Sequence, residues 1–214
     1  MVTENRSQLV SPSDAGPLTA SMPLIDAQAW DSPCAVKENQ PVVSIFITQS
    51  AYCQIRVHTS IDMQHEVGGV LVGQWLLDDQ LDQQFIVIEN SLPARHTRQG
   101  RMFLTFTQDS LVFFHKTIEE HYSGKRIVGW YHTHPGMGIF LSHYDTWLHS
   151  NFFPEPWQVA LVVDPRDALA GFFIRQRDGS LDAANYFGFY ELNGYLGRSL
   201  VRWKNLHRAE VERE

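Results

Sequence analysis

The stretch from Gly129 to Asp145 constrains the fold of this chain more than any other part of the sequence. The apolar, β-prone run Ile127–Tyr131 leads directly into a His-Thr-His triplet, and a Pro-Gly pair then ends the strand. Residues two apart in a strand face the same side, so His132 and His134 can point at one ion while Thr133 faces away. We therefore expect a buried strand whose end carries two imidazoles.

Ser142 and Asp145 follow His134 after an interval of seven residues. Their three-residue spacing places both side chains on one face at the start of a helix. Two imidazoles and one carboxylate form a common open zinc set, in which water takes the fourth position. Each half has a simpler alternative, because Ser-x-x-Asp is close to a helix capping box and His-x-His occurs on exposed strands. Capping and metal binding are compatible, since the helix start would orient Asp145.

A hydrolytic zinc site also needs a group that moves protons near its water, and Glu66 is the best candidate. Glu66 begins the apolar run Glu66–Leu77, where a carboxylate is costly to bury unless it has a partner or a task. The alternative is an exposed glutamate at a strand end. His65 and Glu66 do not begin a His-Glu-x-x-His zinc motif, because Gly69 stands where the second histidine would be.

Composition restricts the remaining classes of function. With 214 residues and 43% hydrophobic side chains, the chain is large enough for one domain with a sizeable core. The net charge of -7 argues against nucleic acid as a partner. No signal region is evident, and no apolar run approaches the roughly 20 residues that span a bilayer. Cys34 and Cys53 are too few for a disulfide framework, so we expect a cytoplasmic protein without a membrane partner.

The remaining sequence predicts strands interspersed with a few helices. Residues 1–40 are polar and lack a clear period, which predicts a flexible N-terminal extension. Residues 41–214 are expected to form one α/β domain with a central mixed β-sheet flanked by helices. We expect strands at Val42–Thr48, Glu66–Leu77, Gln84–Glu89, Met102–Phe106, Ile127–Tyr131, Gln158–Asp164, Gly171–Gln176 and Ala184–Tyr190. We expect helices at Gln49–Ile61, Thr107–Ser123, Asp145–Ser150 and Leu196–Glu212, and a polar loop at Asn90–Arg101.

Taken together, the spaced residues resemble the JAMM signature of the MPN (Mov34/JAB) zinc metalloproteases. The matching positions are Glu66, His132, His134, Ser142 and Asp145. The flanking sequences EVGGVLVG and GWYHTHPGMGIFLSHYD are similar as well, and the resemblance covers about Val42–Arg175. It implies a single MPN domain with a cytidine-deaminase-like fold.

The resemblance also implies a role for each matching residue. His132, His134 and Asp145 would bind one Zn²⁺ per chain together with a water molecule. Glu66 would take the proton of this water and pass it to the leaving amine, and Ser142 would help to stabilise the oxyanion. The implied activity is a deubiquitinase-like isopeptidase or peptidase that cleaves after the C-terminus of ubiquitin or a ubiquitin-like protein. The compact form is similar to bacterial members.

Other functions remain open beside this one. A non-catalytic MPN scaffold subunit would usually lack some ligands, whereas this chain keeps the whole set. A peptidase for small peptides or sulfur-carrier substrates would use the same site. A zinc deaminase would need His-x-Glu with Pro-Cys-x-x-Cys, and the sequence contains neither. Because MPN domains often pair, the resemblance also implies a partner subunit or a homodimer.

Overall fold

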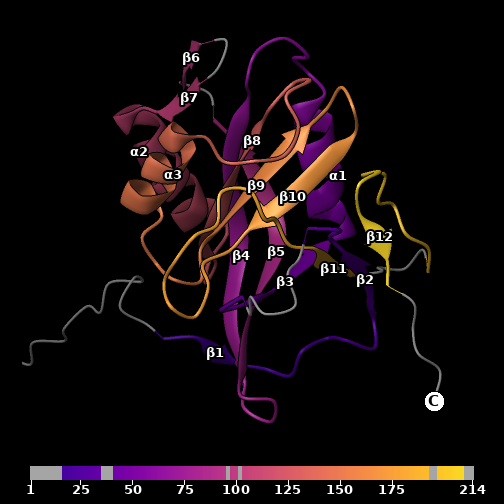
Figure 1. The fold of residues 1–214 in the computed structure, drawn as a ribbon. Coiled ribbons are helices and arrows are strands. Elements are labelled where there is room, and N and C mark those ends of the chain that lie inside the picture. The colour runs from indigo at the N-terminus through magenta and orange to yellow at the C-terminus, as the bar shows by residue number, and fades with distance from the viewer. Residues whose placement is uncertain (1–15, 35–40, 95–96, 101–102, 193–196, 210–214) are drawn as a thin grey trace, which may run out of the picture.

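A mixed β-sheet of ten strands runs through the centre of the molecule (Figure 1). The computed structural model describes residues 16–34, 41–94, 97–100, 103–192 and 197–209. The strands of the sheet are β1 (Leu18–Thr19), β2 (Ala27–Asp31), β3 (Ser44–Thr48), β4 (Gly68–Asp78), β5 (Gln83–Pro93), β8 (Arg126–Thr133), β9 (Val159–Asp164), β10 (Leu169–Phe173), β11 (Phe189–Leu192) and β12 (His207–Arg208). Their spatial order is β10-β9-β8-β4-β5-β3-β11-β2-β12, and β1 pairs with β4.

Three helices and a small second sheet complete the described part of the chain. The helices are α1 (Gln49–Thr59), α2 (Gln108–His121) and α3 (His143–Phe152), and the second sheet pairs β6 (Thr97–Gly100) with β7 (Phe103–Phe106). Helix α1 contacts β3 and β5, whereas α2 and α3 both contact β7. Figure 1 shows α1 on one side of the central strands and α2 and α3 on the other. The expected α/β architecture is confirmed. None of the helices in the described ranges is long and apolar enough to cross a membrane.

Each helix begins at a hydroxyl side chain that caps its first turn. The caps are Thr48, Thr107 and Ser142, all with extended backbone angles. In each case the hydroxyl oxygen accepts the backbone N–H of the third residue after it, which otherwise has no partner within the helix. The helix expected from Thr107 is therefore confirmed, with Thr107 as its cap, and Ser142 fixes the start of α3 relative to the end of β8.

The strands that position the candidate site lie in the middle of the sheet. Strand β8 pairs with β4 on one side and with β9 on the other, and all six residues of β9 are buried. A strand with paired neighbours and both faces covered carries a continuous run of apolar residues, as β9 and the first six residues of β4 do. The end of β8 is consequently held in a rigid interior.

The predicted helix at Leu196–Glu212 is wrong within the described residues 197–209, which form loops and the two-residue strand β12. Charge and spacing along this segment favoured a helix. However, the ring of Trp203 is buried against Tyr52 and Phe189, with centroids 4.9 and 5.6 Å away. This tertiary packing outweighs the local helical preference, because propensity is only a weak prior.

The predicted polar loop at Asn90–Arg101 also needs correction. Strand β5 continues to Pro93, where it pairs with Gly69 of β4, and β6 follows as a further strand. Residues 95–96 and 101 lie outside the described residues. Because β4 is long, its pairing extends β5 beyond the apolar run that ends at Glu89.

Part of the segment predicted as a flexible extension, residues 1–40, contributes strands to the sheet. Strand β1 pairs with β4 in parallel, and β2 pairs with β11 and β12. The indole of Trp30 donates a hydrogen bond to the buried carboxylate of Glu191 at 3.2 Å. Residues 1–15 and 35–40 lie outside the described residues, and a domain boundary at residue 40 stays a prediction.

Candidate metal centre

Strand β8 delivers two buried histidines to one side of the sheet at its C-terminal end. His132 pairs with Gly68 of β4 and with Val162 of β9, and its ring is fully buried. His134 follows directly after the strand, and its backbone N–H donates to Val163 O at 2.8 Å. The two Nε2 atoms are 3.0 Å apart, so both imidazoles do point at one place, as the spacing predicted.

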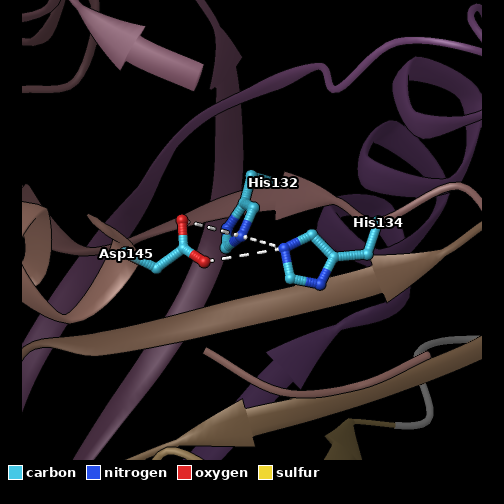
Figure 2. A group of neighbouring side chains, drawn as sticks. All are labelled: His132, His134 and Asp145. Atoms are coloured by element: carbon cyan, nitrogen blue, oxygen red, sulfur yellow. Dashed lines mark hydrogen bonds and ion pairs between the residues drawn. The ribbon is translucent and has the colours of Figure 1, made fainter. Parts of the chain in front are cut away.

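Asp145 reaches the same place from the first turn of α3 (Figure 2). Its oxygen Oδ1 is 3.4 Å from His132 Nε2, and Oδ2 is 3.6 Å from His134 Nε2. The predicted capping box is confirmed, because Ser142 N donates to Asp145 Oδ2 at 2.7 Å and Asp145 N donates to Ser142 Oγ at 3.1 Å. The cap therefore orients the carboxylate toward the two imidazoles.

The spacing of these donor atoms fits a small tetrahedral cation. Zinc bonds of roughly 2.0 to 2.2 Å place the ligand atoms of a tetrahedral site about 3.4 Å apart. The two nitrogens and the nearest carboxylate oxygens are separated by 3.0, 3.4 and 3.6 Å. All three side chains are buried, and they form a group of potential metal ligands within the described residues.

The protonation states favour metal binding as well. Burial lowers the pKa of His132, which keeps a lone pair free on its ring. Burial also opposes the ionisation of Asp145. The neighbouring His132, together with hydrogen bonds from His132, His134 and Ser142, outweighs that effect and holds the pKa of Asp145 well below its usual range. A neutral imidazole beside a carboxylate anion is a donor set that suits Zn²⁺.

Glu66 lies at the same site, although it is far away in the sequence. Its Oε1 atom is 3.9 Å from His134 Nε2, and the side chain is 2% exposed. Burial raises the pKa of Glu66 to about 7, an effect that the nearby His134 reduces and Asp145 reinforces. The other oxygen, Oε2, is buried with no hydrogen-bond partner among the described residues. This carboxyl group is thus poised to gain or lose a proton near neutral pH.

Thr133 joins the segment of Glu66 to the strand of the histidines. Its hydroxyl oxygen accepts the N–H of Val67 at 2.9 Å, and its own N–H donates to Val67 O at 2.9 Å. Thr133 therefore faces away from the two histidines, as expected. Its two hydrogen bonds hold the backbone of Val67, which follows Glu66, against β8.

Asp164, at the end of β9, is a residue of the site that sequence reasoning missed. Its buried carboxylate accepts four backbone N–H groups, from Gly136, Gly138, Arg166 and Asp167, at 2.9 to 3.3 Å. Burial opposes its ionisation, but these donors hold the pKa below its ordinary value. Gly136 and Gly138 have φ values of 74° and 82°, which favour glycine. Asp164 therefore fixes the loop from β8 to α3. The sequence held one sign of this role, because Asp164 directly follows the apolar strand residues Val159–Val163.

Comparison with known proteins agrees with this geometry. Residues 40–153 match the family described as JAB1/Mov34/MPN/PAD-1 ubiquitin protease. The chain is 28% identical over 143 residues to COP9 signalosome complex subunit 5 of Caenorhabditis elegans, which covers 65% of this chain and 36% of that protein. It is 37% identical over 79 residues to the NAD(+) hydrolase TcpA of Theionarchaea archaeon (strain DG-70-1), covering 36% of this chain and 24% of that protein. The chain thus matches well under half the length of these relatives.

A solved structure shares the fold. The solution structure of protein DSY2949 from Desulfitobacterium hafniense superimposes with a TM-score of 0.51 at 19% identity, covering 66% of this chain and 90% of that one. At this identity the likeness concerns the fold alone. The family match, in contrast, extends over more than half of the 214 residues and includes Glu66, His132, His134, Ser142 and Asp145. The chain therefore belongs to the JAB1/Mov34/MPN/PAD-1 family.

Proposed function

We propose that this chain is a zinc-dependent isopeptidase or peptidase that hydrolyses the bond after the C-terminus of ubiquitin or a ubiquitin-like protein. The observation that carries the proposal is the convergence of a buried glutamate, Glu66, with a buried group of two histidines and one aspartate. The family description as a ubiquitin protease supports the substrate class. The cytoplasmic location expected from the sequence stays a prediction.

His132, His134 and Asp145 are the residues that would hold the zinc ion, since their donor atoms converge and are protected from solvent. When bound, zinc would lower the pKa of water to about 7 and polarise the scissile carbonyl. The sheet and the cap of α3 fix the three side chains beforehand, which limits the entropy lost on binding.

Glu66 is the proposed proton carrier. Its raised pKa lets the carboxylate accept a proton from the attacking water at neutral pH. As the new C–O bond forms and the C–N bond breaks, the same proton passes to the leaving amine. No side chain forms a covalent bond with the substrate, so neither cysteine takes part.

Ser142 is the proposed oxyanion donor. Its oxygen accepts the N–H of Asp145, and its hydroxyl hydrogen, which lies beside the Asp145 carboxylate in the free protein, would turn toward a developing negative charge. The positive end of the α3 dipole acts in the same direction.

The proposed partners follow from the same comparisons. The substrate is a ubiquitin-like protein or its conjugate, and a second subunit or a homodimer is in keeping with a relative named as a subunit of the COP9 signalosome complex. The match to TcpA covers only 24% of that protein, so we propose no NAD⁺ hydrolysis here.

The proposal is tested with Glu66→Gln, which keeps the size of the side chain but cannot carry the proton. C-terminal fusions of candidate ubiquitin-like proteins serve as substrates, and bound zinc is measured in parallel. We expect zinc to be retained and turnover to fall by roughly 10²- to 10⁴-fold. Glu120→Gln, an exposed position on α2, is the matched control and should match the wild type.

Two results would contradict the proposal. Unchanged turnover in Glu66→Gln would remove this residue from the mechanism. A wild-type protein that binds no zinc, and gains no activity on its addition, would instead favour a non-catalytic scaffold.

A further inference from the structure

The imidazole of His132 lies flat on the indole of Trp130, two residues earlier in β8. Their ring centroids are 4.6 Å apart and their planes differ by only 8°. Phe153, at the end of α3, is also parallel to the indole, at 5.8 Å and 8°. All three rings are buried. The plane of this proposed ligand therefore continues a stack of rings in the core.

The indole is held in turn by a buried histidine of α3. Trp130 Nε1 donates a hydrogen bond to His149 Nδ1 at 3.0 Å, and His149 is fully buried. An indole N–H can only donate, so Nδ1 must be the acceptor and the ring proton lies on Nε2. His149 stands one helical turn after Asp145 on the same helix. One contact thus links the strand of the two histidines to the helix of the carboxylate.

No protein group among the described residues makes, to His132, the contact that usually orients such a ligand. A metal-bound histidine almost always donates its second ring N–H to a carboxylate, a carbonyl oxygen or water. The Nδ1 atom of His132 is buried and has no hydrogen-bond partner among the described residues. The flat indole surface is in direct contact with the imidazole and limits the rotation of this ring.

We propose that Trp130 and His149 are positioning residues for His132: the indole, held by His149, sets the plane of the imidazole in place of a hydrogen bond donated by Nδ1. The inference rests on the proposed function, because it takes His132 as a metal ligand. It predicts that metal affinity depends on a hydrogen bond that touches neither the metal nor the substrate.

The test compares His149→Leu with His149→Asn. Asparagine can place its side-chain oxygen near the position of Nδ1 and accept the indole N–H, whereas leucine is of similar size and cannot. Zinc affinity is measured by competition with a chelator, and the absorption spectrum of the cobalt-loaded protein reports the ligand geometry. We expect His149→Leu to weaken zinc binding by roughly 10- to 100-fold and to alter the cobalt spectrum. His149→Asn should restore both.

Two further variants separate positioning from general loss of packing. Trp130→Phe keeps a ring over His132 but loses the donor, so it should weaken zinc binding in the same direction and serves if His149→Leu does not fold. Phe46→Leu removes volume from a second core cluster, formed with Leu76 and Phe85. It should lower thermal stability and leave zinc affinity unchanged.

The inference is overturned if His149→Leu and Trp130→Phe bind zinc as tightly as the wild type. It is equally overturned if His149→Asn loses as much affinity as His149→Leu, because packing alone would then explain both. If the wild-type protein binds no zinc, that result contradicts the proposed function itself and not only the role of Trp130 and His149.

Discussion

At the scale of single residues, Thr133 connects the two halves of the candidate site. Its hydroxyl is the acceptor for the N–H of Val67, next to the proposed base Glu66. Thr133→Val has nearly the same shape but leaves that buried N–H unpaired, which costs about 1 to 3 kcal/mol. We expect lower stability in urea and a lower turnover number with zinc content unchanged. Thr133→Ser should restore both, and equal behaviour of Thr133→Val and the wild type would contradict this role.

His149 makes a second prediction at this scale, on the pH dependence of stability. Burial, and to a lesser extent Arg175, lowers its pKa to about 3 from an ordinary value of 6.5. Between pH 6.5 and 3, His149 is protonated in the unfolded chain and neutral in the folded one, so acid favours unfolding. The loss reaches at most about 1.4 kcal/mol per pH unit between these values. Above pH 6.5 His149 is neutral in both states and contributes no pH dependence to the free energy of unfolding.

Urea unfolding of the metal-free protein at several pH values measures this effect. Between pH 6 and 4, the free energy of unfolding should fall more steeply for the wild type than for His149→Asn. Identical slopes would show that His149 is protonated in the folded protein too.

Local spacing was sufficient to predict part of the site. The common face of His132 and His134 and the capping box of Ser142 and Asp145 each depend on residues at most three apart. The position of Glu66 depends instead on the pairing of β4 with β8, which local patterns do not encode. The cost of burying a carboxylate at the head of an apolar strand marked Glu66 as a candidate, and only the family resemblance linked it to the two histidines. The Trp130–His149 contact joins a strand to a helix and could not be predicted from either.

At the scale of elements, the loop between β8 and α3 depends on the end of β9. The carboxylate of Asp164 uses both oxygens to hold this loop, through Gly136 and Gly138. Asp164→Asn keeps the size of the side chain but turns one acceptor into a donor that faces a backbone N–H. We expect a loss of about 1 to 3 kcal/mol in unfolding free energy and weaker zinc binding, because the loop joins the ligands of β8 to α3.

Thermal unfolding and chelator competition measure the two effects of Asp164→Asn. Asp167→Asn, which changes an exposed neighbour, is the control and should stay within about 0.5 kcal/mol of the wild type. Similar values for both variants would mean that the loop is held by its own backbone.

Elements were predictable where periodicity and packing agree. The central strands and the helices α1 and α2 follow apolar patterns whose residues are buried in the core, whereas α3 follows from the spacing of Ser142 and Asp145. The helix prediction for the segment before β12 is wrong because isolated apolar residues, above all Trp203, enter the core from an irregular backbone. Arg202 N then donates to the hydroxyl of Tyr52 at 2.7 Å, which satisfies the backbone without a helix.

At the scale of the whole molecule, one end of the sheet is built from both ends of the described chain. Strand β2 lies between β11 and β12, and Glu191 in β11 is fully buried. Its carboxylate accepts hydrogen bonds from Trp30, Gln49 and Leu200. Removal of β2 would leave one of these acceptor positions unfilled and would expose the edge of β11, which favours aggregation.

This arrangement predicts different outcomes for two truncations. A chain that starts at residue 16 keeps β1 and β2 and should unfold at the same temperature as the full chain. A chain that starts at residue 35 should unfold at a lower temperature and sediment partly as aggregates. Both should still bind zinc, since the pairing of β4, β8 and β9 is untouched. Equal stability of the two would instead support a domain that begins near residue 41, to which β1 and β2 add no stability.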